Sequence, residues 1–224
     1  MDEPPNPVIA SIRSAGRSRM RLIVLDDGRE FVFCDEACER AGAREGMAAT
    51  EALFAALDGW EQRVNGHEAA LRLLSHRARS ENEMRTRLGM RGIAPAIIEE
   101  EIVRLRDAGL LDDEQFARAW VEDRKRFAPR GRRMLRYELL GRGIEPESVD
   151  AVTGDIDDAD TALTLARAKA RGSIANADWE TFLAKVGGFL RRRGFDYGVS
   201  TEAARTVWAE LQPAREAQRE IADA

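Results

Sequence analysis

The amino-acid sequence predicts a mainly α-helical protein, in which tandem three-helix repeats form a curved stack behind a small N-terminal module with a β-hairpin. The first observation is a 51-residue period, at which Arg91-Gly92-Ile93 recurs as Arg142-Gly143-Ile144 and as Arg193-Gly194-Phe195. The second is that residues which start and end helices recur in the same register. The third is an Asp-Gly pair between two β-prone segments near the N-terminus.

The repeat extends beyond this motif. Upstream apolar positions keep the same register, as Met84, Leu135 and Val186, and as Leu88, Leu139 and Leu190. Pro95 and Pro146 follow the first two copies, whereas Tyr197 takes this place in the third. A fixed period of this size indicates copies of one supersecondary unit arranged in tandem.

The N-terminal part is expected to differ from the repeats. Residues 1–7 are acidic and proline-rich, so we expect a disordered tail there. Residues 21–33 are two β-prone runs around Asp27-Gly28, which predicts a hairpin with a type I′ turn, because that turn needs positive φ at both central positions. Residues 8–12 can add a third strand, and two helical segments complete a module at residues 8–65.

Each repeat is predicted to hold three helices. In the first, Ser80 and Glu83 form a capping box at the start of the second helix. Gly92 fits the left-handed position that ends this helix, and Pro95 suits the first position of the next. The buried stripe of that third helix is expected to consist of Ile98, Ile102 and Leu105, and Gly109 closes it. The Arg-Gly-Ile motif therefore marks a helix end and a helix restart.

The same signals place the repeats at residues 66–111, 112–156 and 157–211, the third being degenerate. Asp112 and Gln115 start the first helix of the second repeat, and Pro129 ends it. Pro213 is expected to end the last helix, so that residues 212–224 form a C-terminal tail.

The charge is unevenly distributed along the chain. The net charge is −5, which argues against a simple non-specific nucleic-acid coat. From Arg124 to Arg142, however, there are eight basic residues and one acid, whereas residues 143–166 hold seven acids and no base. This asymmetry predicts a basic face beside an acidic one.

Catalytic, metal and membrane signals are weak. Cys34 and Cys38 are about thirty residues from the histidines, His67 and His76, so no set of four zinc ligands is apparent. The sequence has no GxSxG, Gly-rich phosphate loop or HExxH, and Glu99-Glu100-Glu101 is expected to be an exposed helix face. With no signal peptide, no membrane span and two cysteines, we expect a cytoplasmic protein that is neither an enzyme nor a cofactor or metal binder.

Three segments resemble the RecX family of recombinase regulators: ALRLLSHRARSENEMRTRL at 70–88, GLLDDEQFARAWVEDR at 109–124, and RGRRMLRYELLGRGI at 130–144. The resemblance spans roughly residues 67–211. It implies an all-helical body of tandem three-helix units. It also implies a partner, the RecA–single-stranded DNA filament, whose growth and strand exchange such a protein restrains in recombination and DNA repair.

The candidate contact residues form two basic clusters. The first comprises Arg124, Lys125, Arg126, Arg130, Arg132, Arg133 and Arg136, with Tyr137 among them, and the second comprises Arg191 and Arg192. A charge run is often only a solvated face, but crowded like charges repel unless an anion offsets them. Arginine also suits bidentate pairing with carboxylate or phosphate. Part of the second cluster has a structural explanation, since a helix C-terminus favours cations; the same holds for Arg91, Arg142 and Arg193.

The aromatic residues Trp120, Trp179 and Trp208 are expected to pack in the core, whereas Tyr137 could stack on a base. Two hypotheses follow. In the first, a monomer lies along the RecA filament, its arginines contact acidic surface or nearby phosphates, and its acidic stretch at 145–160 meets basic surface. In the second, the helical repeat binds DNA without a partner protein.

Overall fold

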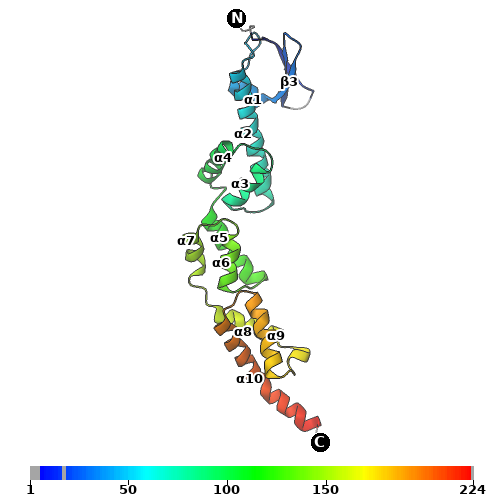
Figure 1. The fold of residues 1–224 in the computed structure, drawn as a ribbon, viewed down its shortest axis with the longest axis vertical. Helices are drawn as coiled ribbons and strands as arrows, with labels where there is room; N and C mark the ends of the chain where they lie inside the picture. Colours follow the sequence, from blue (N-terminus) through cyan, green and yellow to red (C-terminus); the bar gives the residue numbers. More distant parts are fainter. Residues whose placement is uncertain (1–5, 17–18, 223–224) are drawn as a thin grey trace, which may run out of the picture. The chain divides into compact units, whose positions relative to one another are not determined.

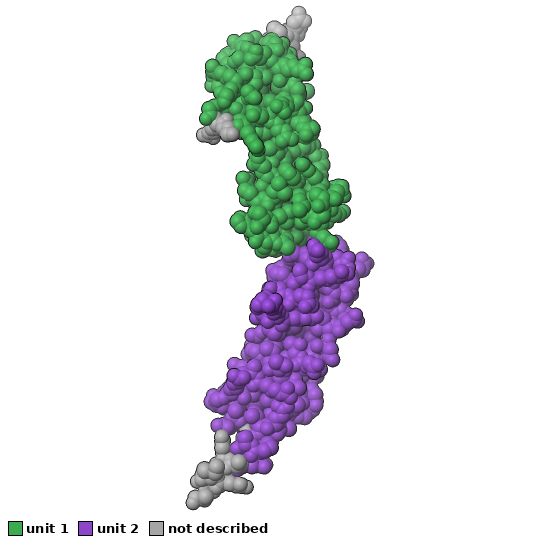
Figure 2. Space-filling view, turned by 180° about the vertical axis from the view of Figure 1, so that it is seen from behind, with its two compact units in different colours: residues 1–112 green, residues 113–224 purple. Residues whose placement is uncertain are grey.

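The computed structural model describes residues 6–16 and 19–222, and the chain divides into two compact units, Met1–Asp112 and Asp113–Ala224 (Figure 2). The described residues form ten α-helices, one short 3₁₀ helix and one three-stranded sheet (Figure 1). The predicted fold class, tandem three-helix units after a small β-containing module, is confirmed. Of the tail expected at residues 1–7, residues 1–5 lie outside the described residues. In the described part, the Pro7 carbonyl accepts a hydrogen bond from the Ala49 N–H at 2.7 Å.

The N-terminal sheet is antiparallel, with strand order β1 (Ile9–Ser14), β2 (Met20–Leu25) and β3 (Glu30–Cys34). The expected hairpin and third strand are present, but the predicted type I′ turn is wrong. Gly28 has φ of 85°, whereas Asp27 is not among the described residues with positive φ. The Asp27 carboxylate instead accepts the Arg29 N–H at 3.1 Å, while the Gly28 N–H donates to the Leu25 carbonyl at 3.0 Å. These bonds hold a three-residue loop with Gly28 in the left-handed position.

The first two helices are α1 (Asp35–Ala41) and α2 (Glu51–His76). Leu53 and Leu57, in the first half of α2, belong to the core that the sheet covers. Ala69 and Ala70, in its second half, belong to the core of the first repeat. The boundary expected between residues 65 and 66 therefore falls inside one continuous helix, because α2 has an apolar face for the sheet and another for the repeat.

The first repeat continues with α3 (Glu81–Gly89) and α4 (Pro95–Asp107). The predicted residues start and end these helices: Ser80 Oγ accepts the Glu83 N–H at 3.1 Å, Gly92 has φ of 79°, and α4 starts at Pro95. The Ser80 half of the expected capping box is thus confirmed, and the Glu83 carboxylate pairs with Arg77 at 2.8 Å. The Ile93 N–H donates back to the Leu88 carbonyl at 3.4 Å, the bond of a Schellman motif. Ile98, Ile102 and Leu105 are buried as expected.

The acidic triplet of α4 is exposed only in part. Glu99 and Glu100 lie on the surface, but Glu101 is buried, contrary to the prediction, and its Oε1 lies 2.8 Å from His67 Nδ1 of α2. Helical geometry explains the difference, because Glu101 follows Ile97 and Ile98 by four and three residues and so shares their buried face. A buried carboxyl group needs a polar partner, and the imidazole supplies it.

The second unit contains the other two repeats. The second repeat comprises α5 (Asp113–Phe127), α6 (Arg132–Leu140) and α7 (Pro146–Thr153); the third comprises α8 (Asp158–Lys169), the 3₁₀ helix η1 (Gly172–Ile174), α9 (Trp179–Arg192) and α10 (Tyr197–Ala222). Gly143 and Gly194 have φ of 76° and 91°, so the motif ends a helix in all three copies. Each repeat has its own core, formed around Leu135 and Leu139 in the second and around Phe182 and Leu190 in the third.

The last helix does not end at Pro213, as the sequence led us to expect, but continues to Ala222. Pro213 is exposed, so the carbonyl one turn earlier that lacks an N–H partner can bond to water instead. The Gln212 side-chain amide also donates to the Trp208 carbonyl at 3.2 Å. Most of the expected tail at 212–224 is therefore helical backbone.

Candidate interaction surface

The two basic clusters meet at the junction of the second and third repeats. The Gly131 N–H donates to the Arg193 carbonyl at 2.9 Å, and the Arg193 guanidinium donates to the Pro129 carbonyl at 3.2 Å. A Cβ atom on Gly131 would lie 2.5 Å from the backbone of Gly194, and one on Gly194 would lie 2.3 Å from Met134 Cβ. Two glycines thus allow the start of α6 to lie against the end of α9, which places residues 130–133 beside residues 191–193.

The junction brings Arg130, Arg132 and Arg193 together, beside the acids Asp157, Asp158 and Asp196. Burial lowers the pKa of the Arg193 guanidinium, and the neighbouring charge of Arg130 lowers that pKa further. The Arg132 backbone N–H donates to both carboxylate oxygens of Asp158, at 3.0 and 3.1 Å, which caps the N-terminus of α6. Burial raises the pKa of Asp158, while this N–H partly opposes the rise. The charge of Arg132 also lowers the pKa of Asp158, although no ion pair joins the two side chains.

Several predicted contact residues have structural partners instead. Glu138, the single acid of the basic run, accepts hydrogen bonds from Trp120 Nε1 and Arg124 Nε, both at 2.8 Å, and lies 3.8 Å from Arg130 Nε. The guanidinium groups of Arg124 and Arg142 lie 3.9 and 3.6 Å from the centre of the Trp120 ring. These arginines hold α5 and α6 together around Trp120, and sequence reasoning missed Glu138 as their common partner.

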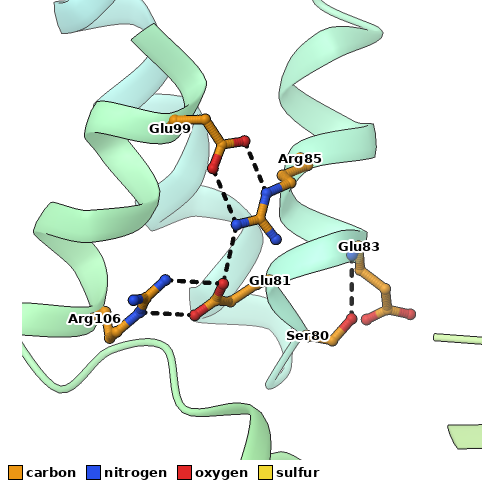
Figure 3. A network of polar contacts seen from close by, with 6 residues as sticks. All are labelled: Ser80, Glu81, Glu83, Arg85, Glu99 and Arg106. Carbon is orange, nitrogen blue, oxygen red and sulfur yellow. Dashed lines mark hydrogen bonds and ion pairs between the residues drawn. The ribbon is translucent and has the colours of Figure 1, made fainter. Parts of the chain in front are cut away.

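Arg136 also has an internal role. It pairs with Asp150, and these positions are equivalent to Arg85 and Glu99 of the first repeat, 51 residues earlier. Figure 3 shows the first-repeat pair in detail: Arg85 Nε lies 2.8 Å from Glu99, its Nη2 lies 3.1 Å from Glu81, and Glu81 also binds Arg106. An ion pair at equivalent positions in two repeats indicates that Arg136 joins α6 to α7.

The remaining arginines face solvent. Arg126, Arg132, Arg133, Arg191 and Arg192 are exposed, and no ion pair between described residues involves any of them. Lys125 is exposed but lies 3.0 Å from Glu122. Four of the five solvent-facing arginines lie on α6 and α9, beside the Gly131–Gly194 contact.

Large apolar side chains accompany these arginines. Tyr137 is 74% exposed, one turn after Arg133 on α6, and the partly exposed Leu140 follows on the same face. Phe127 is 70% exposed, with the Arg126 guanidinium 5.1 Å from the centre of its ring. The sequence analysis identified Tyr137 as a candidate but missed Phe127 and Leu140. Both could have been found from the helical period, because each is an apolar residue at a position expected to face solvent. Exposed aromatic and arginine side chains are typical of binding surfaces.

Several acids of the stretch at 145–160 form contacts within the second unit. Asp150 pairs with Arg136, Asp157 accepts the Ala159 N–H at 2.9 Å, and Asp158 caps α6. The exposed acids that remain are Glu145, Glu147, Asp155 and Asp160. The expected basic and acidic faces therefore neutralise each other in part.

Cys34 and Cys38 have structural positions. Cys34 Sγ accepts the Ala37 N–H at 3.3 Å at the start of α1, and burial raises the pKa of this thiol to about 11. Cys38 is buried in the same core. Within the described ranges, no three His, Cys, Asp or Glu side chains gather as a metal site would require. Over the same ranges, no helix is both long and apolar enough to cross a bilayer.

Comparisons with known proteins agree with this architecture. Residues 67–105 match the first three-helix domain of RecX, and residues 112–152 match its second. The regulatory protein RecX of Mycobacterium sp. (strain KMS) is 33% identical over 68% of this chain and 85% of its own length. The regulatory protein RecX of Corynebacterium efficiens is also 33% identical, over 78% of this chain and 86% of its own length. A crystal structure of regulatory protein RecX has a TM-score of 0.66 and 22% identity, over 86% of this chain and 96% of that one, which shows the same fold.

Proposed function

The chain belongs to the RecX family of regulatory proteins, and from this premise we propose that it binds the RecA–single-stranded DNA filament and restrains its activity in recombination and repair. The observation that carries this proposal is the joined arginine surface of the second unit. Arg132, Arg133, Arg191 and Arg192 face solvent beside a backbone contact that only glycines permit. A surface of arginines whose side chains form no internal ion pair suits carboxylates or phosphates on a partner.

A protein–DNA filament fits the charge balance better than bare DNA does. The net charge of −5 opposes long-range attraction to a free polyanion. The local surface, in contrast, combines arginines with exposed Tyr137, Phe127 and Leu140, a composition typical of protein interfaces. We therefore propose that a monomer in the cytoplasm contacts acidic protein surface on the filament and the phosphates next to it, without a cofactor.

The test uses a triple variant, Arg126→Ala, Arg132→Ala and Arg133→Ala. These side chains are exposed and form no ion pair with another described residue, so the free energy of unfolding should change by about 0.5 kcal/mol or less. We expect the wild-type protein to inhibit the RecA ATPase on single-stranded DNA and the triple variant to need at least about tenfold more protein for equal inhibition.

The matched control is Arg44→Ala, Arg87→Ala and Arg91→Ala, which removes three exposed arginines of the first unit and changes the net charge equally. It should inhibit like the wild type. If both variants inhibit normally, the arginine surface does not carry the function. If the surface variant instead weakens binding to bare single-stranded DNA, and the salt dependence of that binding falls by about 0.7 per lost contact, the partner-independent DNA-binding alternative is favoured.

A further inference from the structure

The third repeat lacks the ion-pair network that joins the helices of the first. The network positions Glu81, Arg85, Glu99 and Arg106 (Figure 3) correspond, two periods of 51 residues later, to Leu183, Gly187, Thr201 and Trp208. The second repeat keeps the central pair as Arg136 and Asp150. The third has therefore exchanged every charged group of the network for an apolar, small or neutral one.

The exchange leaves a groove between α9 and α10, which lie side by side (Figure 1). Its volume is about 260 Å³, and its walls include Trp179, Leu183, Ala184, Gly187, Tyr197 and Thr201. Glu180, Arg191 and Ser200 also line it, so both charge signs are present at its edge. A Cβ on Gly187 would lie 3.3 Å from Leu183 Cδ1, so the wall at this point is backbone and a leucine methyl group. The positions that hold an Arg–carboxylate pair in the first two repeats thus border an open space.

The groove walls suit an apolar side chain. Trp179 is already engaged, with the ring centre of Phe182 at 6.4 Å and that of Trp208 at 5.5 Å. The Arg191 guanidinium lies 5.6 Å from the centre of the Tyr197 ring. A nucleobase binds best to an open aromatic face, and the exposed Tyr197 ring at one edge offers one. Away from that edge, however, the walls are formed by Leu183, Ala184 and the Gly187 backbone, with Glu180 and Ser200 as polar neighbours. Hydrophobic anchor residues in such pockets dominate many protein interfaces.

The charges beside the groove indicate which groups of a partner would flank an apolar side chain bound in it. Arg191 borders the groove and Arg192 follows it on α9; both are exposed, and neither takes part in an ion pair between described residues. We propose that the groove of the third repeat docks an apolar side chain of a partner protein, with carboxylates next to it that pair with Arg191 and Arg192. The inference rests on the proposed function and deepens it, because the partner is the protein component of the filament.

The experiment restores the missing pair. Gly187→Arg with Thr201→Glu copies Arg85 and Glu99 of the first repeat and fills the groove with charged side chains. The variant should fold with a nearly unchanged melting temperature. Glycine is unfavourable inside a helix and the ion pair has a native precedent in this chain, and these gains offset the shift of Leu183 Cδ1 that a Cβ at 3.3 Å requires. Its affinity for the RecA–single-stranded DNA filament should fall by at least about tenfold, the loss typical of a blocked anchor.

The control is Thr164→Glu with Ala168→Arg, which places the same two charges one turn apart on the exposed face of α8, away from the groove. It should bind like the wild type. If the wild type binds the filament and the filled variant binds equally well, the groove proposal is overturned and the proposed function stands. If the wild type does not bind, both are overturned. If the filled variant loses binding to bare single-stranded DNA in the same proportion, the occupant is a nucleobase, which also overturns the proposal.

Discussion

Gly92 and Gly194 occupy the same place in the repeat, but their surroundings differ. Both have positive φ, 79° and 91°, because each ends a helix in the left-handed conformation. Around Gly92 a Cβ would meet no atom within 4 Å, whereas at Gly194 it would meet Met134 Cβ at 2.3 Å. One glycine is needed for its backbone angles alone, and the other also for the close contact between two repeats.

The first prediction compares substitutions at these glycines. Gly92→Ala should lower the free energy of unfolding by about 1 kcal/mol, the strain of a left-handed alanine. Gly194→Ala should lower it by about 3 kcal/mol or more, since the methyl group also forces the repeats apart. Urea denaturation followed by circular dichroism measures both. Gly198→Ala, at an open helical position of the same unit as Gly194, is the control and should be neutral or slightly stabilising. Equal losses at Gly92 and Gly194 would contradict the close contact.

At the scale of helices, an ion pair joins the second and third helix in each of the first two repeats. Arg85–Glu99 links α3 to α4, and Arg136–Asp150 links α6 to α7. These side chains are partly exposed, so each pair should contribute only about 0.2–1 kcal/mol. Each pair therefore mainly fixes the packing of two short helices against each other and contributes little to the overall free energy of unfolding.

A charge exchange tests this role. Arg136→Asp should destabilise by about 1 kcal/mol, because it places two carboxylates together, and Asp150→Arg should do the same with two guanidinium groups. The double exchange should recover most of the loss, and the recovery should shrink in high salt, which screens exposed pairs. Thermal unfolding of the four proteins forms a double-mutant cycle. Additive losses without recovery would mean that Arg136 points to an external partner.

At the scale of the whole molecule, α2 links the N-terminal sheet to the first repeat as a single helix. Its residues near the expected boundary already serve the repeat: Gln62 Oε1 accepts the Ala94 N–H at 2.9 Å, and Arg63 binds Glu100 at 2.7 Å. Thr50 Oγ1 accepts the Leu53 N–H at 3.2 Å and caps the helix start. The N-terminal module and the first repeat are thus one unit in structural terms.

Two truncations follow from this. Removal of residues 1–49 keeps α2, its cap and both contacts, whereas removal of residues 1–65 deletes Gln62 and Arg63. The shorter protein should retain a helical fold but be less stable than residues 50–224 by about 1–2 kcal/mol, the cost of the two lost contacts. Urea denaturation of both proteins measures the difference. Equal stability would show that the first half of α2 serves only the sheet.

The residues that start and end the helices could be identified from the sequence. The capping Ser80, the glycines of the Arg-Gly-Ile motif and Pro95 act through their own backbone preferences, and the structure has each where the period places it. The apolar stripe of Ile98, Ile102 and Leu105 was also readable, because burial follows helical spacing. The sequence by itself therefore determined the mainly helical repeat architecture and the segments that carry basic charge.

Only the tertiary structure decided which charges remain free. Glu138 and Asp150 engage part of the basic run, whereas the Arg132 and Arg133 side chains face solvent. The meeting of Gly131 with Gly194, 63 residues apart, brings Arg191 and Arg192 to the same surface. Likewise, the groove beside Gly187 is bordered by the two positions that hold a charged pair in the other repeats. Such outcomes depend on contacts between distant segments, and a local pattern of residue types carries no information about which of these contacts form.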